Sequence, residues 1–141
     1  MSDVRDRIVD AARGWIGTPF SHCGRSRHGI DCVGLIVVAY REAGLQIRDR
    51  TNYGWIGRPD ELRTAVCEAF SRIDVDNADA GDIFTMRIGD LEQHVAIYTG
   101  AGTIIHVYAS ANGMRGAVTE HAITVPWHNR ITGCWRHKEL G

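Results

Sequence analysis

The chain has 141 residues, of which 44% are hydrophobic and 23% charged, so it predicts one compact domain over residues 1–141 rather than a disordered chain. Its 16 basic and 17 acidic residues leave a formal net charge of -1. Because a balanced chain has no overall basic field, general electrostatic binding to nucleic acid or to an anionic membrane surface is excluded.

The N-terminal segment is charged and lacks a long apolar run. A secretory signal needs an apolar stretch of roughly 7–15 residues and a membrane helix about 20, so we expect a soluble chain, made in the cytoplasm, without membrane insertion. Thiols stay reduced in that compartment, so the four cysteines are expected to be free. A substrate outside the cytoplasm would then require another delivery route.

The first half of the chain favours helices. Apolar residues at helical spacing predict a first helix over residues 3–15, capped by Ser2 or Asp3. The apolar stretch from Ile30 to Gly44 suits a strand by composition, but its periodicity and the terminal glycine favour a buried helix. Other segments are predicted as a break at 17–20, a polar loop at 21–29, an irregular stretch at 49–59, and a short helix at 59–70 opened by Pro59.

The second half of the chain favours strands. From Gly81 onward, short runs rich in Val, Ile, Thr and Tyr alternate with Gly and Asp, which is typical of antiparallel strands. We expect strands at residues 82–88, 94–99, 103–109, 117–124 and 131–137. Helices followed by strands predict an α+β domain whose N-terminal helices pack on an antiparallel sheet of about five strands.

Cys32 stands at the predicted start of the buried helix. The thiolate is the nucleophilic form of cysteine, and the free N–H groups and macrodipole of a helix N-terminus favour it. We therefore expect Cys32 to be an activated nucleophile. Cys67 and Cys134 are expected in the core, while Cys23 lies in a polar loop and is a candidate second exposed thiol.

His94 is the candidate base, because it opens an alternating strand that would hold its side chain rigidly on a sheet face. In a hairpin with Ala96 opposite His106, the two histidines share a face at roughly 7–8 Å between backbones. His106 would then orient His94 as the third member of a triad. The alternative is a strand histidine with no catalytic role. The N–H of Cys32 and a group of the preceding loop are the expected oxyanion donors.

Five motifs in sequence order resemble the NlpC/P60 family of cell-wall peptidases. They are GTPF at 17–20 for the family's GTPY, DCVGL at 31–35 for DCSGL, GDIF at 81–84 for GDL, HVAIY at 94–98 for HVGIY, and IH at 105–106 for IHA. The resemblance covers about residues 5–110. It implies a papain-like fold and hydrolysis of an amide bond in peptidoglycan stem peptides, next to D-glutamate. It also implies that Asp31 holds the free amino group of the stem peptide.

Two positions depart from the family motifs at the expected substrate groove. Phe20 replaces a tyrosine, which removes a hydroxyl that would contact the substrate or the oxyanion, and Val33 replaces the serine after the nucleophile. His22 either faces solvent or lines the groove. The expected substrate-binding residues are therefore Asp31, Phe20, Val33 and His22, with the bond that is cleaved left open.

The GTPF and DCVGL forms, followed by the loop Ser21-His22-Cys23, are similar to NlpC/P60 peptidases encoded beside phage tail genes and in gene transfer agents. That resemblance implies delivery on a phage-like tail, tail hub or baseplate proteins as partners, and action in the periplasm or cell wall. Two other functions stay open. One is a tail component that binds wall peptide or tail proteins without turnover, and the other is an amidase or acyl transferase with the same triad.

A zinc site near the C-terminus is a weaker hypothesis. His121, His128, Cys134 and His137 gather there, but the chain has no CxxC or HExxH motif, and alternation would point Cys134 and His137 to opposite faces of one strand. We expect neither a metal nor an organic cofactor, because an acyl-enzyme on cysteine requires none. The sequence leaves open whether certain aromatic residues fill the core or line the groove, namely Tyr53, Trp55 and Trp127.

Overall fold

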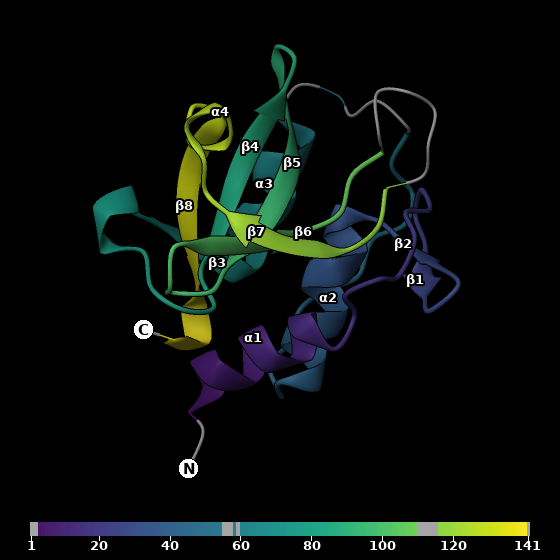
Figure 1. Ribbon diagram of the computed structural model, residues 1–141, viewed down its shortest axis with the longest axis horizontal. Coiled ribbons are helices and arrows are strands. Elements are labelled where there is room, and N and C mark those ends of the chain that lie inside the picture. The colour runs from purple at the N-terminus through teal and green to yellow at the C-terminus, as the bar shows by residue number, and fades with distance from the viewer. Residues whose placement is uncertain (1–2, 55–57, 59, 110–115, 141) are drawn as a thin grey trace.

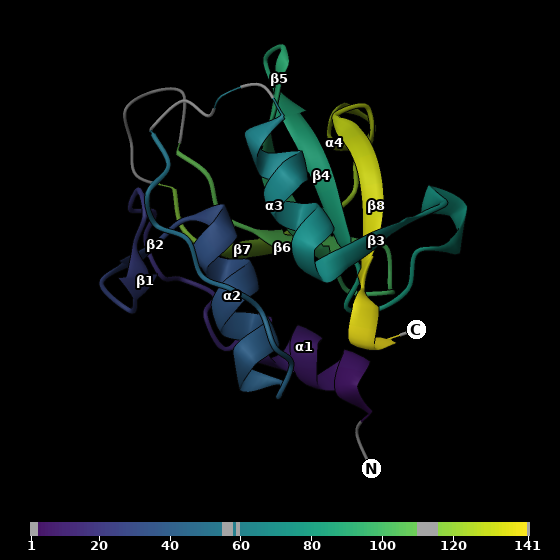
Figure 2. The same ribbon diagram turned by 180° about the vertical axis from the view of Figure 1, so that it is seen from behind.

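The computed structural model describes residues 3–54, 58, 60–109 and 116–140. Three residues named in the sequence predictions lie outside these residues, namely the candidate helix cap Ser2, the aromatic residue Trp55 and the predicted helix start Pro59. Helices pack against a six-stranded antiparallel sheet, which confirms the predicted α+β class (Figures 1 and 2). In chain order the elements are α1 Val4–Arg13, β1 Arg25–Ser26, β2 Gly29–Ile30, α2 Cys32–Glu42, α3 Glu61–Ala69, β3 Phe70–Ile73, the 3-10 helix η1 Val75–Asn77, β4 Ile83–Ile88, β5 Leu91–Tyr98, β6 Thr103–His106, β7 Thr119–Ala122, α4 Val125–His128, β8 Ile131–His137 and the 3-10 helix η2 Lys138–Leu140.

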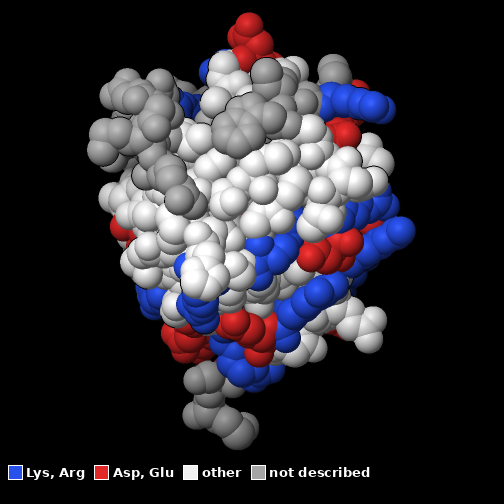
Figure 3. All heavy atoms as spheres, turned by 90° about the vertical axis from the view of Figure 1, so that its right-hand side faces the viewer, with Lys and Arg blue, Asp and Glu red and all other residues white. Residues whose placement is uncertain are grey.

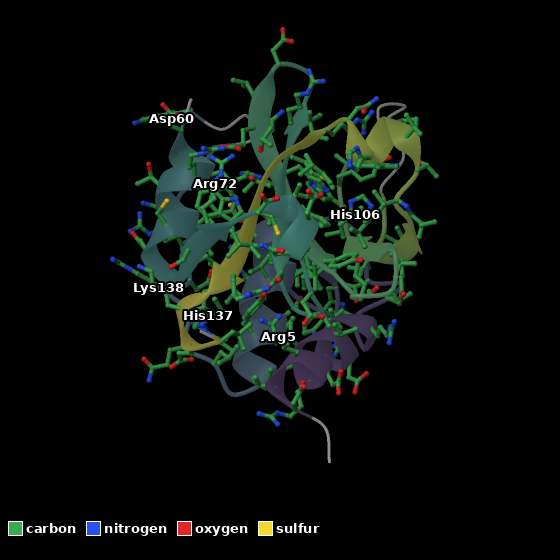
Figure 4. All side chains as sticks on the ribbon, turned by 90° about the vertical axis from the view of Figure 1, so that its left-hand side faces the viewer. Arg5, Asp60, Arg72, His106, His137 and Lys138 are labelled. Atoms are coloured by element: carbon green, nitrogen blue, oxygen red, sulfur yellow. The ribbon has the colours of Figure 1, made fainter. Side chains whose placement is uncertain are left out.

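Helix α1 forms where the apolar spacing predicted it. The carboxylate of Asp3 accepts a hydrogen bond from the N–H of Asp6 and so satisfies a donor that the first turn leaves without a helical partner. The buried side of α1 packs against α2. Arg5 extends from α1 to the carbonyl of Ala80 and to the buried carboxylate of Asp82, which ties the helix to the sheet (Figure 4).

Helix α2 is the buried helix that carries Cys32 at its first position, so the choice of helix over strand for this segment is confirmed. Asp31 caps it by accepting the N–H of Gly34 at 2.8 Å, and Gly44 follows its end at a φ of +92°. A Cβ at Gly34 would lie 2.6 Å from the carbonyl oxygen of Gly24. Only glycine there lets the first turn of α2 approach the preceding loop so closely.

The strands pair in the order β3-β8-β4-β5-β6-β7, antiparallel throughout. The five predicted strands correspond to β4 through β8, with shorter bounds for β6 and β7. Helices α2 and α3 lie over one face of the sheet, while β6 and β7 run across the ends of β4 and β5, so the sheet curls (Figures 1 and 2). Its apolar residues form two clusters, one shared with the helices and one around Phe84 and Ala96.

The sequence prediction missed four short elements, namely β1, β2, β3 and α4, as well as the two 3-10 helices. The edge strand β3 follows α3 without a break; its first residue, Phe70, is the end of the predicted helix and residues 71–73 belong to no predicted element, since the four residues show almost no apolar alternation. β1 and β2 form a two-stranded hairpin that begins in the segment predicted as a polar loop and ends at Ile30, which is predicted as helical, and α4 is a single turn. None of the helices in the described residues is long and apolar enough to cross a membrane.

Candidate active site

Cys32 lies at the N-terminus of α2, where the helix packs against Val95 of β5. The main-chain N–H groups of Val95, Val33 and Cys32 itself approach the sulfur and favour its ionised form. Burial opposes them more strongly, and the negative charge of Asp31 adds to the opposition, so the pKa of the Cys32 thiol is raised to about 12. The thiol is therefore neutral at rest.

This neutral thiol differs from the resting thiolate that the sequence predicted. A helix N-terminus does stabilise a thiolate, but desolvation in the packed site outweighs that stabilisation, and the capping carboxylate of Asp31 offsets the positive end of the helix. Burial likewise lowers the pKa of His94 to about 3, with the charge of Arg130 as a smaller cause. The free site thus holds an uncharged thiol and an uncharged imidazole.

His94 and His106 meet as the strand register predicted. Strands β5 and β6 pair Ile97 with Ile105 and Tyr98 with Ile104. Continuing that register by one residue puts Ala96 opposite His106, on the face that His94 shares. The Nε2 of His94 lies 2.7 Å from the Nδ1 of His106.

His106 is completely buried, and its ring packs edge-on against Trp127 of α4 with centroids 4.7 Å apart. Figure 4 shows His106 among side chains crowded between the sheet and α4. The pKa of His106 is lowered to about 2, first by burial and then by the neighbouring His94, His121 and Arg130. Trp127 therefore shields the histidines and is neither a pure core residue nor a lining residue of the cavity at Cys32.

A third imidazole, that of His121, extends the pair of His94 and His106 to a chain of three linked histidines. The Nε2 of His106 lies 2.7 Å from the Nε2 of His121 on β7, and the Nδ1 of His121 lies 2.8 Å from the carbonyl oxygen of Ala122. Sequence reasoning considered His121 only as a zinc ligand and missed this contact. The register of β6 and β7 would have revealed it, since His121 pairs with Ile104 and is diagonal to His106.

The carboxylate of Asp31 is almost fully buried and already engaged. One oxygen accepts from the N–H of Gly34 at 2.8 Å and from the guanidinium of Arg25 at 2.9 Å, and the other accepts from the N–H of Cys23 at 2.8 Å and from the hydroxyl of Tyr53. Burial and this contact with Asp31 raise the pKa of Tyr53 far above its ordinary value. An incoming ammonium group would have to displace one of these four donors.

Cys32 and His94 line one cavity of about 680 Å³. Of the residues predicted for the site, those that line it are Phe20, His22, Asp31, Cys32, Val33 and His94. His106 does not line the cavity and lies behind His94. Sequence reasoning missed several polar lining residues, namely Arg50, Arg58, Glu61, Glu92 and Gln93. The side of the molecule that carries β1 and β2 is dominated by uncharged residues in its upper half, with charged side chains gathered below (Figure 3).

The described residues contain one group of possible metal ligands, formed by His22, Cys23 and Asp31, whose donor atoms lie within 4.8 Å of one another. Because both oxygens of Asp31 already accept two hydrogen bonds each, this group offers a poor ligand set. The C-terminal residues considered for zinc form no such group. His121 belongs to the histidine chain, and His137 contacts the carbonyl of Gln46.

Comparison with protein families gives a match to the NlpC/P60 family over residues 17–136, a range that includes Cys32 and all three linked histidines. Among curated proteins, the chain is 29% identical over 119 residues to "Murein DD-endopeptidase MepS/Murein LD-carboxypeptidase" of Escherichia coli K12. That alignment covers 84% of this chain and 57% of MepS, so the chain spans little more than half of that relative.

Among solved structures, the NlpC/p60 domain of the peptidoglycan hydrolase SagA is similar with a TM-score of 0.62 and 29% identity, covering 94% of this chain and 97% of that domain. RipD from Mycobacterium tuberculosis has a TM-score of 0.66 at 20% identity, covering 98% of this chain and 99% of RipD. RipD is described as a non-catalytic NlpC/p60 domain protein adapted to peptidoglycan binding, and its likeness bears on the fold alone.

Proposed function

The chain belongs to the NlpC/P60 family, and we propose that it is a cysteine peptidase that hydrolyses amide bonds in peptidoglycan stem peptides. One observation carries this proposal. Cys32 and His94 line the same cavity, and His94 is held from behind by a 2.7 Å hydrogen bond to the fully buried His106. That arrangement supplies a nucleophile, a base and a group that orients the base.

In the proposed reaction, the sulfur of Cys32 bonds to the amide carbonyl carbon while His94 takes the thiol proton. The main-chain N–H of Cys32 is the proposed oxyanion donor. The C–N bond then breaks, and the leaving amine takes the proton from His94, which leaves a thioester on Cys32. Water attacks the thioester and gives its proton to His94, and the acid product departs as the thiol is restored. No metal or organic cofactor enters these steps.

The neutral resting pair shapes how this reaction starts. Because the pKa of Cys32 is raised and that of His94 lowered, the thiol does not transfer its proton to the imidazole in the free site. Deprotonation then occurs together with attack, when the developing oxyanion and the bound peptide change the local electrostatics. Without a positioned substrate the neutral thiol is protected from adventitious oxidants, which react with the thiolate.

The proposed substrate side is a stem peptide with the cleaved bond next to D-glutamate. Phe20 and Val33 give the cavity an apolar wall, whereas Arg50 and Arg58 add cationic lining that suits a carboxylate. Arg50 pairs with Glu68, and its buried Nε is the one buried side-chain donor without a partner among the described residues. An anionic group of the substrate would satisfy it.

This substrate assignment is testable by kinetics. Arg50→Gln should raise KM for a stem peptide and leave kcat nearly unchanged, because Arg50 binds a group away from the reacting carbonyl. Arg72→Gln, an arginine on β3 outside the cavity lining, is the matched control and should leave both constants unchanged. Unchanged KM in Arg50→Gln would remove Arg50 from the substrate site.

A second candidate function is wall-peptide binding without turnover. The raised pKa of the Cys32 thiol favours it, and RipD shows that this fold is compatible with peptidoglycan binding in a non-catalytic protein. Digestion of purified sacculi, with Cys32→Ala as control, separates the two. Soluble fragments released by the parent alone support the peptidase, whereas equal co-sedimentation of both proteins without release supports the binding module.

An amidase or acyl transferase would use the same three residues. Mass spectrometry of the products distinguishes these activities, because hydrolysis adds one water across the cleaved bond and transfer adds the acceptor amine instead. The position of the new termini shows whether the bond lies inside the stem peptide or at its junction with the glycan. The peptidase proposal predicts a free carboxyl terminus inside the stem peptide.

Delivery on a phage-like tail, with tail hub or baseplate proteins as partners and the periplasm or cell wall as the place of action, is a separate part of the proposal. It rests on the GTPF and DCVGL motif forms at residues 17–20 and 31–35. Proteomic analysis of purified tail particles from the source cells tests it. Detection of the chain at a fixed ratio to baseplate proteins supports delivery, and its presence only in the soluble fraction contradicts it.

A further inference from the structure

The three linked histidines end on a main-chain carbonyl, which sets the direction of hydrogen-bond donation from ring to ring. We propose that His121 is a positioning residue. Anchored by the carbonyl of Ala122, it fixes the tautomers of His106 and His94 and leaves the Nδ1 of His94 as the nitrogen that takes the Cys32 proton. The catalytic consequence rests on the proposed peptidase function, while the tautomers themselves do not.

The carbonyl of Ala122 accepts a hydrogen bond and cannot donate one. The Nδ1 of His121 lies 2.8 Å from the oxygen of Ala122, so this nitrogen carries the proton. A neutral imidazole has one N–H, which leaves the Nε2 of His121 as an acceptor. That nitrogen faces His106.

The protonation of His121 constrains His106 and, through it, His94. At 2.7 Å from an acceptor, the Nε2 of His106 must donate, so its Nδ1 accepts. The Nε2 of His94, 2.7 Å from that Nδ1, must then donate as well. His94 therefore carries its proton on Nε2, and its Nδ1 keeps the free lone pair. Burial keeps the rings of His94 and His106 neutral, which their lowered pKa values support.

The three rings must also be held rigidly, because rings that could rotate would not fix a tautomer. Trp127 contacts all three rings, at centroid distances of 6.2 Å to His94, 4.7 Å to His106 and 5.4 Å to His121. On β7, Glu120 pairs with Arg13 and accepts from the hydroxyl of Thr103, so the strand that carries His121 is held at both sides. Because His94 and His106 are almost fully buried, water cannot replace the hydrogen bond between their rings.

Ring-nitrogen NMR tests the tautomers directly. In a uniformly ¹⁵N-labelled sample of this 15.6 kDa chain, two-bond ¹H–¹⁵N correlation spectra distinguish protonated from bare ring nitrogens. We expect His94 and His106 as Nε2–H forms and His121 as the Nδ1–H form at neutral pH. An Nδ1–H form for His94 or His106, or an Nε2–H form for His121, would overturn the proposal.

Two substitutions test the catalytic consequence. His121→Leu removes the acceptor, so His94 should populate both tautomers, kcat should fall about tenfold and KM should stay within about twofold. His121→Gln keeps an acceptor oxygen and should recover most of kcat. His128 is exposed and is not one of the three linked histidines. His128→Leu is therefore the matched control and should leave kcat, KM and the tautomer of His94 unchanged. Amide NMR spectra establish that each variant is folded.

The outcomes separate the two proposals. Full kcat in folded His121→Leu, or a parent-like tautomer of His94 in that variant, would show that His121 does not set the base. If the parent does not cleave stem peptides but shows the expected tautomers, the peptidase function fails and the tautomer relay stands. Expected tautomers together with loss of kcat in His121→Leu and its recovery in His121→Gln would establish both.

Discussion

Replacing His106 with alanine removes the ring that links His94 to His121. The Nε2–H of His94, a side chain only 2% exposed, then loses its single acceptor. A buried donor left without a partner costs ~1–3 kcal/mol, and loss of a buried ring adds a cavity cost of a few kcal/mol. We expect His106→Ala to lower the free energy of unfolding by about 3 kcal/mol, measured by urea denaturation.

The same substitution should reduce turnover without abolishing it. His94 keeps its place on β5 but loses the bond that holds its ring and tautomer, so we expect kcat on a stem peptide to fall about 10- to 100-fold at a temperature where the variant is folded. His106→Asn keeps an acceptor oxygen near the position of Nδ1 and should retain more activity than alanine. His94→Ala should be inactive. Full kcat in His106→Ala, or equal kcat in the alanine and asparagine variants, would refute the orienting role.

Three further predictions follow from the charges and burial of the site. Burial raises the pKa of Cys32, so its alkylation by iodoacetamide should keep accelerating above pH 9. Cys67, which is exposed and not in the core as the sequence predicted, should react first at neutral pH. A Cys32 rate that levels off below pH 7 would instead indicate a resting thiolate. His94 and His106 are held neutral, so the free energy of unfolding, fully retained above pH ~6.5, should decline as the pH falls toward 3, because the unfolded chain binds protons that the native state refuses. Urea titrations at a series of pH values check this, and replacing both histidines with glutamine should make the decline shallower. Arg25→Gln removes the cation paired with buried Asp31 and should lower the free energy of unfolding in urea by about 2–3 kcal/mol. Arg13→Gln, at the more exposed pair with Glu120, should lower it by less than about 1 kcal/mol. Equal losses would argue that the pair of Arg25 and Asp31 does not stabilise the fold.

Local pattern was enough to predict the fold class and part of the site geometry. The apolar periodicity of α2 and the alternation of β5 and β6 are properties of short segments, and the tight turn at 99–102 sets the register that brings His94 to His106. The motif around Cys32 placed the thiol at a helix N-terminus, as the structure has it. Whether these residues catalyse hydrolysis stays a prediction.

Features that depend on distant packing escaped the sequence. His121 joins the histidine chain only through the pairing of β7 with β6, and a long connection between those strands leaves their register unset by local pattern. The bonds from Arg25 and Tyr53 to Asp31 depend on loops that the sequence shows only as polar. The neutral state of Cys32 follows from desolvation, which a helix-terminus argument does not contain.

In the proposed reaction, Cys32 forms a thioester with a stem peptide. Intact-protein mass spectrometry after acid quench of a stem-peptide reaction tests it most directly. We expect an adduct of the acyl fragment's mass, located at Cys32 by peptide mapping, which decays as hydrolysed product appears and is absent from Cys32→Ala. Product formation at equal rates by Cys32→Ala, or an adduct on another residue, would contradict it.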